Sequence, residues 1–252
     1  MKHTQVSNMK VIIKVVNRIR MKVIKLVLKG FLLNRYIELV DDRNETVPNE
    51  RALEYSFLFN SLLKKDVSTV LDVGTGVTAL PSLLETCGFK TTAIDNIEDY
   101  WGGGMFNTHY HVINDNILNT KLKGTFDAIT CISVLEHIYD HDTAISTMLS
   151  LLNPGGRLVL TFPYNENTYI NNVYEKEGAS WGGHVKYIAQ VFSRKNIDKW
   201  LEDNNGFKII KQEYWQNYTG EFHVFGDFIY PPKKSSTEEK HQLTCILIEK
   251  DI

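Results

Sequence analysis

Short apolar runs that end in polar or turn-forming residues recur along the middle of the chain. β-Branched and other apolar residues fill the stretches 70–73, 89–95, 109–113, 126–133 and 157–163. Apolar runs of this kind, bounded by turn signals and separated by helix-length segments, are typical of buried strands in α/β proteins. The pattern therefore predicts an α/β sheet whose strands alternate with helices.

The first run ends in Asp72 and is followed at once by Gly74, Thr75 and Gly76. A tight glycine turn between a strand and a helix lets a ligand approach the backbone at the helix N-terminus. The spacing Gly74-x-Gly76-x-x-Ala79 also satisfies a dinucleotide-binding pattern. Asp72 favours a different ligand, because a carboxylate repels a pyrophosphate and attracts a cationic amino-acid group such as that of S-adenosylmethionine.

A second acid, Asp95, ends the next predicted strand and is followed by Asn96. Asp95 lies 23 residues beyond Asp72, near the offset of roughly 20 residues at which an acid binds ribose hydroxyls. This position suits NAD and S-adenosylmethionine equally, and a solvated strand-end Asp is the alternative. Asp115 and Asn116 follow the third run, where local turn formation is an alternative to ligand binding.

The fourth run, 126–133, leads directly into Leu135-Glu136-His137. With the acid-x-Gly-x-Gly turn at 72–76, this segment resembles the class I S-adenosylmethionine-dependent methyltransferases, although Thr78 replaces the third glycine of their first motif. A helix, the turn 153–156 and a fifth strand follow in the order of that family. Two later runs, 207–215 and 243–249, match its antiparallel terminal strands.

The resemblance implies a Rossmann-like, doubly wound sheet of seven strands, mostly parallel with an antiparallel terminal strand. It also implies roles for individual residues around S-adenosylmethionine. The methionine part would contact Asp72, Gly74, Thr75 and Gly76, and the ribose would contact Asp95 and Asn96. The adenine would contact Asp115 and Asn116, and the sulfur would lie beside Cys131, Ile132 and Ser133. Arg51 and Tyr55, from the helix predicted over 49–63, would contact the carboxylate.

Three residues are candidates for catalysis. His137 leaves the carboxyl end of the sheet, and an imidazole can take a proton from an acceptor hydroxyl near neutral pH. An orienting role is the alternative for His137, because alignment alone drives many group transfers. Tyr164 and His184 lie in the segment 164–190, which is rich in Asn, Tyr and Gly and follows the fifth strand. Loops at this end of a sheet carry specificity, although an ordinary surface insertion explains single residues there equally well.

The N-terminal region differs from the rest in its charge. Basic residues recur every three or four positions in 10–33, and on a helix they form one stripe beside a broad apolar face: Lys10, Lys14, Arg18, Lys22, Lys25 and Lys29. Such a helix is too charged to span a bilayer, and it lacks a cleavage signal. Contact with an anionic membrane surface and packing on its own domain or a partner subunit both remain open.

Composition bounds the remaining possibilities. The net charge of −2 gives no general attraction to nucleic acid. Cys87, Cys131 and Cys245 lack metal-binding spacing and are expected to be reduced core residues of a cytoplasmic protein. Asp140, His141 and Asp142 are best explained by helix capping, and no metal site is predicted. The predicted organisation is an extension over 1–48 and a methyltransferase domain over 49–252, with insertions at 164–190 and 217–240.

The sequence thus predicts methyl transfer from S-adenosylmethionine to an oxygen of a sugar, glycan-linked or other small-molecule acceptor. The resemblance is to methyltransferases of surface-polysaccharide and secondary-metabolite pathways. Carbon or nitrogen methylation of a quinone-like or amine metabolite is the alternative. An NAD-dependent oxidoreductase and a non-catalytic scaffold are the less favoured possibilities.

Overall fold

The computed structural model describes residues 49–63, 66–100, 104–182 and 187–252. The predicted N-terminal extension, including the basic helix over 10–33, lies outside these residues, and so does His184. The division at residue 48 therefore stays a prediction. None of the helices in the described ranges has the length and apolar character needed to cross a membrane.

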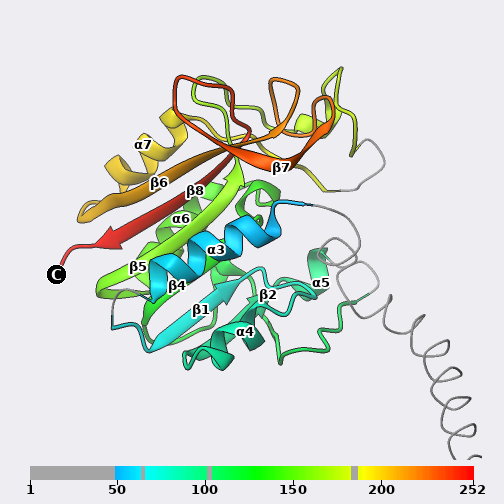
Figure 1. Cartoon of the computed structure of the whole chain (residues 1–252). Coiled ribbons are helices and arrows are strands. Elements are labelled where there is room, and N and C mark those ends of the chain that lie inside the picture. The colour runs from blue at the N-terminus through cyan, green and yellow to red at the C-terminus, as the bar shows by residue number, and fades with distance from the viewer. Residues whose placement is uncertain (1–48, 64–65, 101–103, 183–186) are drawn as a thin grey trace, which may run out of the picture. The chain divides into compact units, whose positions relative to one another are not determined.

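One mixed sheet organises the described chain (Figure 1). The strands lie in the order β3-β2-β1-β4-β5-β8-β6-β7. Neighbours from β3 to β5 pair in parallel, and those from β5 to β7 pair antiparallel. Their bounds are β1 (Thr69–Val73), β2 (Lys90–Asp95), β3 (Ile113–Asn114), β4 (Phe126–Ile132), β5 (Leu152–Pro163), β6 (Phe207–Tyr218), β7 (Phe228–Ser235) and β8 (Leu243–Lys250). The predicted Rossmann-like class is confirmed.

The expected number of seven strands is wrong, because the described sheet has eight. The additional strand is β7, which lies within the segment 217–240 that was predicted as an insertion. It contains Pro231 and Pro232, and proline cannot donate a hydrogen bond to a ladder. An edge strand tolerates proline, and β7 pairs on one side only, with β6.

Helices cover both faces of the sheet. They are α3 (Arg51–Leu62), α4 (Leu80–Thr86), α5 (Ile97–Tyr100), α6 (His141–Ser150) and α7 (Arg194–Asp203), with single 3-10 turns η1 (Ile117–Asn119), η2 (Leu135–His137) and η3 (Val173–Glu175). Asp140 caps α6 by accepting from Thr143 N at 3.1 Å, and Ser193 forms a capping box with Asn196 before α7. The Asp140 cap confirms the sequence prediction of capping at this helix.

Alternating side chains of the central strands divide the core into two layers. Leu158, Leu160 and Phe162 of β5 pack with residues of α6 and α7, including Met148 and Trp200. Val159 points to the opposite face, where α3 and α4 supply Phe57, Leu58, Leu62, Leu80 and Leu84. The sheet is therefore fixed on both sides, and its carboxyl-terminal edge is held in place for a ligand.

The two predicted insertions pack on each other beyond the ends of β5 and β6. Ile170, Val173 and Ala189 of the first insertion share a small apolar cluster with Val224 of the second, and Val191, directly after the first insertion, completes it. Ile170 and Val191 also bridge through their backbones, as do Ala179 and Phe225. These loops form a small layer of their own above the carboxyl edge (Figure 1).

The cysteines divide into two groups. Cys131 and Cys245 are buried in strands, as predicted. Cys87 is exposed at the C-terminal end of α4, so its prediction as a core residue is wrong. The apolar neighbours of Cys87 in sequence belong to the helix, which ends just before it and leaves the thiol at the surface.

Candidate functional site

The strand order reverses between β1 and β4, and the carboxyl ends of these strands gather the predicted ligand residues. Ligands of open α/β sheets bind at this kind of switch point. Asp72 lies near the end of β1, Asp95 ends β2, and Ser133 follows β4. Thr161 of β5 lies beside them, since its oxygens accept from the Ser133 backbone N–H, each at 3.0 Å.

The glycine turn after β1 depends on the absence of a side chain. Gly74 has a φ of 75°, in the left-handed region that favours glycine. A β-carbon at Gly74 would lie 2.3 Å from Val134 Cγ1. The turn is anchored to β2, because Gly74 N donates to Ile94 O at 2.9 Å and Gly76 N donates to Asp95 Oδ2 at 2.8 Å. Asp95 therefore joins the turn to the second strand.

Asp72 is a buried carboxyl group held by two hydroxyls. Thr130 Oγ1 donates to its Oδ1 at 2.6 Å, and Thr75 Oγ1 donates to its Oδ2 at 2.7 Å. Burial raises the pKa of Asp72 to about 6, against the opposing effect of these two hydrogen bonds. A cation bound nearby would favour the ionised form.

Asn107, in the loop between β2 and β3, was not predicted from the sequence. Its Nδ2 donates to the carbonyls of Gly76 and Thr78, each at 2.9 Å. Its Oδ1 accepts from His109 N and Tyr110 N. Asn107 thus holds the far side of the glycine turn, opposite Asp95. Its neighbours in sequence carry no motif that would have identified it.

We expect Asn107→Ala to weaken binding of S-adenosylhomocysteine about tenfold, because two hydrogen bonds that shape the turn are lost. Titration calorimetry measures this change. Asn60→Ala is the matched control, since Asn60 Nδ2 donates to Ser56 O on the exposed side of α3. Equal affinities of the Asn107 variant and the wild type would contradict the role of Asn107.

The first turn of α3 reaches the same end of the sheet. Glu54 is fully buried, and its Oε1 accepts from Ser133 Oγ at 2.6 Å and from Thr161 Oγ1 at 2.7 Å. Arg51 Nη1 donates to Glu54 Oε2 at 3.0 Å and to Ile132 O at 3.2 Å. The helix is thereby fastened to the ends of β4 and β5. Glu54 was missed because its partners are distant in sequence.

Tyr55 lies on the same helix. Burial raises the pKa of Tyr55 to about 12, while Arg51 and a hydrogen bond with the Thr78 side chain oppose the shift. Thr78 belongs to the glycine turn, so Tyr55 reaches the turn from α3. The structure therefore brings Arg51 and Tyr55 to the predicted site, and their contact with a cofactor carboxylate stays a prediction.

The Leu-Glu-His segment forms η2 directly beyond β4. His137 Nδ1 lies 2.6 Å from Ile188 O. A carbonyl oxygen only accepts, so Nδ1 carries the proton and Nε2 is the basic nitrogen of the neutral ring. Glu136 beside it is 4% exposed, and burial raises the pKa of Glu136 to about 8.

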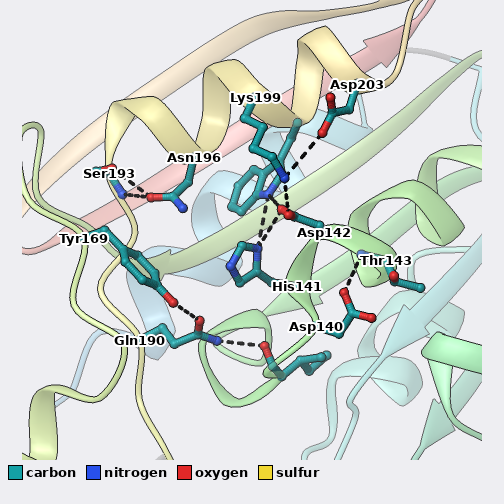
Figure 2. Close-up of polar contacts among 12 residues, drawn as sticks. Asp140, His141, Asp142, Thr143, Tyr169, Gln190, Ser193, Asn196, Lys199 and Asp203 are labelled. Atoms are coloured by element: carbon teal, nitrogen blue, oxygen red, sulfur yellow. Dashed lines mark hydrogen bonds and ion pairs between the residues drawn. The ribbon is translucent and has the colours of Figure 1, made fainter.

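Gln190 ties η2 to the first insertion. Its backbone N donates to Glu136 O at 2.9 Å, and its Nε2 donates to Ile138 O at 2.7 Å. Tyr169 Oη donates in turn to Gln190 Oε1 at 2.6 Å, as Figure 2 shows. The acceptor-side loop and the turn that carries His137 are therefore one hydrogen-bonded unit.

Aromatic rings extend from His137 into that insertion. The His137 and Tyr187 centroids are 4.8 Å apart, those of Tyr187 and Tyr174 6.1 Å, and those of Tyr174 and Trp181 5.2 Å, each pair edge to face. Trp181 is partly exposed at the end of this row. The row offers an apolar platform that runs from the predicted base to the surface.

Other predicted residues have local partners. Asp115 accepts from Thr120 Oγ1 at 2.6 Å and from the backbone of Asn116 and Lys121. Asn116 caps η1 by accepting from Leu118 N. Asn96 follows Asp95, and Cys131 and Ile132 are buried at the end of β4. Contact of these five residues with adenine, ribose and sulfur stays a prediction.

Tyr164 is fully buried, and its hydroxyl donates to Glu166 Oε2 at 2.7 Å. Burial and this hydrogen bond raise the pKa of the phenol well above its usual range. The side chain packs within the core next to the ring of His241. A catalytic role for Tyr164 stays a prediction, and no contact described for this side chain reaches the glycine turn or His137.

The polar cluster at the start of α6 joins two helices (Figure 2). Asp142 accepts from Trp200 Nε1 at 2.9 Å and pairs with Lys199 of α7, which also contacts Asp203. His141 lies 3.0 Å from Asp142. These contacts dock α6 on α7. In the ranges that the structure describes, no three His, Cys, Asp or Glu side chains are placed to share a metal ion.

The site as a whole carries more acidic than basic side chains among the described residues. The carboxyl groups of Glu54, Asp72 and Glu136 are buried near the guanidinium of Arg51, and Asp95 faces Asp72. A buried acid is stabilised in its charged form by a nearby cation. The donor set therefore fits a cationic ligand better than a pyrophosphate, and it fits a sulfonium donor with an ammonium group.

Comparison with known proteins agrees with this geometry. The family model of the methyltransferase domain matches residues 44–212. The ubiquinone biosynthesis O-methyltransferase of Xanthomonas axonopodis pv. citri (strain 306) is 32% identical over 120 residues, which cover 45% of this chain and 49% of that protein. The chain thus spans about half the length of the curated relatives that it matches.

Solved structures support the fold. A 1,6-didemethyltoxoflavin-N1-methyltransferase from Burkholderia thailandensis superimposes with a TM-score of 0.55 at 14% identity, covering 88% of each chain. The N-methyltransferase NodS from Bradyrhizobium japonicum WM9, bound to S-adenosylhomocysteine, gives 0.50 at 20% identity over 83% of this chain and 92% of that one. At these identities the similarity concerns the fold.

Proposed function

The chain belongs to the methyltransferase domain family, whose methyl donor is S-adenosylmethionine, and we propose that it methylates an oxygen atom of a small-molecule acceptor. The observation that carries this proposal is the surplus of buried carboxyl groups around a glycine turn at the switch point of the sheet. Gly74, Asp72 and Asp95 would hold the donor, with Asn107 and Tyr55 shaping the turn.

When bound, S-adenosylmethionine supplies an electrophilic methyl group on sulfur, and the C–S electron pair stays on the sulfur as a neutral thioether. Asp72 would pair with the ammonium group, and Asp95 with the ribose. Arg51 and Glu54 hold α3 against the ends of β4 and β5. These contacts fix the walls between which donor and acceptor are aligned, and alignment supplies much of the rate of such transfers.

His137 is the proposed general base. Its Nδ1 donates to Ile188 O, so Nε2 accepts the proton that the acceptor hydroxyl loses as its oxygen forms the new bond to carbon. Gln190 holds η2 against the insertion that carries the aromatic row. A ring platform beside a base suits the apolar part of a small acceptor.

Several acceptors remain within this proposal. A sugar or glycan-linked hydroxyl would use the polar side chains of 164–190, and a quinone-like acceptor would use the aromatic row. The curated relative is named as an O-methyltransferase, which favours oxygen over the alternative of carbon or nitrogen.

We further propose that residues 10–33 contact an anionic membrane or a partner subunit, and that the protein acts in the cytoplasm. Vesicle cosedimentation of the full chain tests the membrane contact.

Two measurements test the function. We expect calorimetric titration to show micromolar binding of S-adenosylmethionine and S-adenosylhomocysteine without binding of NAD. With an acceptor found by mass spectrometry of methylated products, His137→Gln is expected to lower kcat by about 100-fold or more, as loss of a general base does. NAD binding alone would overturn the donor, and full turnover of the variant would overturn the base.

A further inference from the structure

Glu136 is a buried acid with an incomplete set of hydrogen bonds in the described part of the chain. Its Oε1 lies 4.0 Å from His137 Nε2. Its Oε2 has no hydrogen-bond partner in the described part of the chain. An acid buried in this way costs stability unless a positive charge or a proton compensates it. Glu136 directly precedes His137, the proposed base, so a protonated His137 can supply this compensating charge.

The groups that face Glu136 come from two elements besides its own turn. Glu50, Arg51 and Glu54 approach from the start of α3, and Cys131 comes from β4. Burial, Glu54 and Glu50 disfavour a charge on Glu136, whereas a hydrogen bond from its own backbone N–H and the nearby Arg51 favour it. Arg51 already donates to Glu54 and to Ile132 O.

Among the described residues, His137 supplies a further compensating group, from the same turn as Glu136. Its ring is held between Tyr187 and the carbonyl of Ile188. A proton that arrives on Nε2 lands on the side that faces Glu136 Oε1. The imidazolium would therefore form next to the buried acid.

We propose that Glu136 is a positioning residue that stabilises a proton on His137 Nε2. The proposal rests on the proposed role of His137 as base. The proton passes from the acceptor hydroxyl to Nε2, the imidazolium pairs with Glu136 in the ionised form of that acid, and the proton later leaves to solvent. Because burial raises the pKa of Glu136 into the range of an imidazole, the two groups titrate as a pair.

A second acid–histidine pair in the same chain provides the control. His141 and Asp142 also adjoin in sequence and lie 3.0 Å apart (Figure 2). Asp142 has other partners, since it accepts from Trp200 and pairs with Lys199. Its replacement should affect His141 and leave His137 unchanged.

The experiment is an NMR titration of the histidines in the full chain saturated with S-adenosylhomocysteine. The signals are assigned with His137→Gln and His141→Gln. We expect Glu136→Gln to lower the pKa of His137 by about one unit or more, a tenfold loss of proton affinity, because two opposite charges at this distance interact strongly. Glu136→Asp is expected to restore part of the shift. Asp142→Asn should move His141 alone.

The result separates this inference from the proposed function. An unchanged His137 pKa in Glu136→Gln, or an equal shift in Asp142→Asn, overturns the inference even if His137→Gln abolishes turnover. The shift in Glu136→Gln together with full turnover of His137→Gln supports the pairing and overturns the catalytic base. If the pH at which turnover is lost on acidification shifts in Glu136→Gln, the result supports both the pairing with Glu136 and the catalytic role of His137.

Discussion

Replacing Gly74 by alanine is expected to weaken donor binding about 100-fold or more and to lower the free energy of unfolding by about 2–4 kcal/mol. Two effects add at this position. The φ of 75° is strained for alanine, and the new β-carbon would lie 2.3 Å from Val134 Cγ1. Val134 directly precedes η2, so relief of the clash must displace the glycine turn, the segment carrying His137, or both. Calorimetry with S-adenosylhomocysteine and urea unfolding measure the two quantities.

Gly124→Ala is the matched control for backbone strain. Gly124 has a φ of 104°, and no atom lies within 4 Å of a β-carbon built there. This variant should lose only about 1 kcal/mol and bind the donor normally, because it carries the strain without the clash. Donor binding by Gly74→Ala at wild-type strength would refute the argument that the turn must approach Val134 closely to hold its ligand.

The sequence predicted the parallel half of the sheet because its strands are buried on both faces and their polar residues sit at the carboxyl ends. Asp72 and Asp95 lie at the carboxyl ends of their strands, and Leu-Glu-His follows closely after β4. The glycine pattern encodes a backbone conformation, which one short segment specifies by itself. These features are local, so a linear pattern reveals them.

The features that were missed depend on contacts between distant segments. Glu54 meets Ser133 and Thr161 across 79 and 107 residues. Asn107 reaches back 31 residues to Gly76. No periodicity in the chain records such contacts. The edge strand β7 was missed for another reason: its two prolines mark a break in most strands, and only its place at the edge of the sheet makes them acceptable.

The structure also changes the interpretation of residues whose positions relative to the strands were predicted correctly. Asp115 follows β3 as expected, yet its carboxylate accepts hydrogen bonds from three donors of its own loop, one of them shared between both oxygens. Tyr164 directly follows the fifth strand, yet it is buried in the core. A residue type at a motif position indicates where chemistry can occur. The hydrogen bonds already made by its side chain decide how much capacity is left for a ligand.

Glu136→Gln is expected to make the protein more stable than the wild type at alkaline pH. Burial raises the pKa of Glu136 from 4.5 to about 8 in the folded protein. A raised folded-state pKa gives stability that is complete below the unfolded value and is lost as the pH rises to the folded value. Between about pH 5.5 and pH 8.5 the variant should therefore gain on the order of 3 kcal/mol relative to the wild type. Urea unfolding across this range measures the difference.

Asp127→Asn is the control of opposite sign. Although burial opposes it, hydrogen bonds from Thr69, Asn153 and Ser68 lower the pKa of Asp127. Its replacement should therefore destabilise the protein above the acid range. If Glu136→Gln follows the wild type at every pH, Glu136 is ionised without cost and its compensation lies elsewhere. If the Glu136→Gln variant is more stable and its His137 has a lower pKa, the wild type retains an acid that destabilises the fold. The gain in the free energy of unfolding would then measure the stability that is lost in order to stabilise a proton on His137.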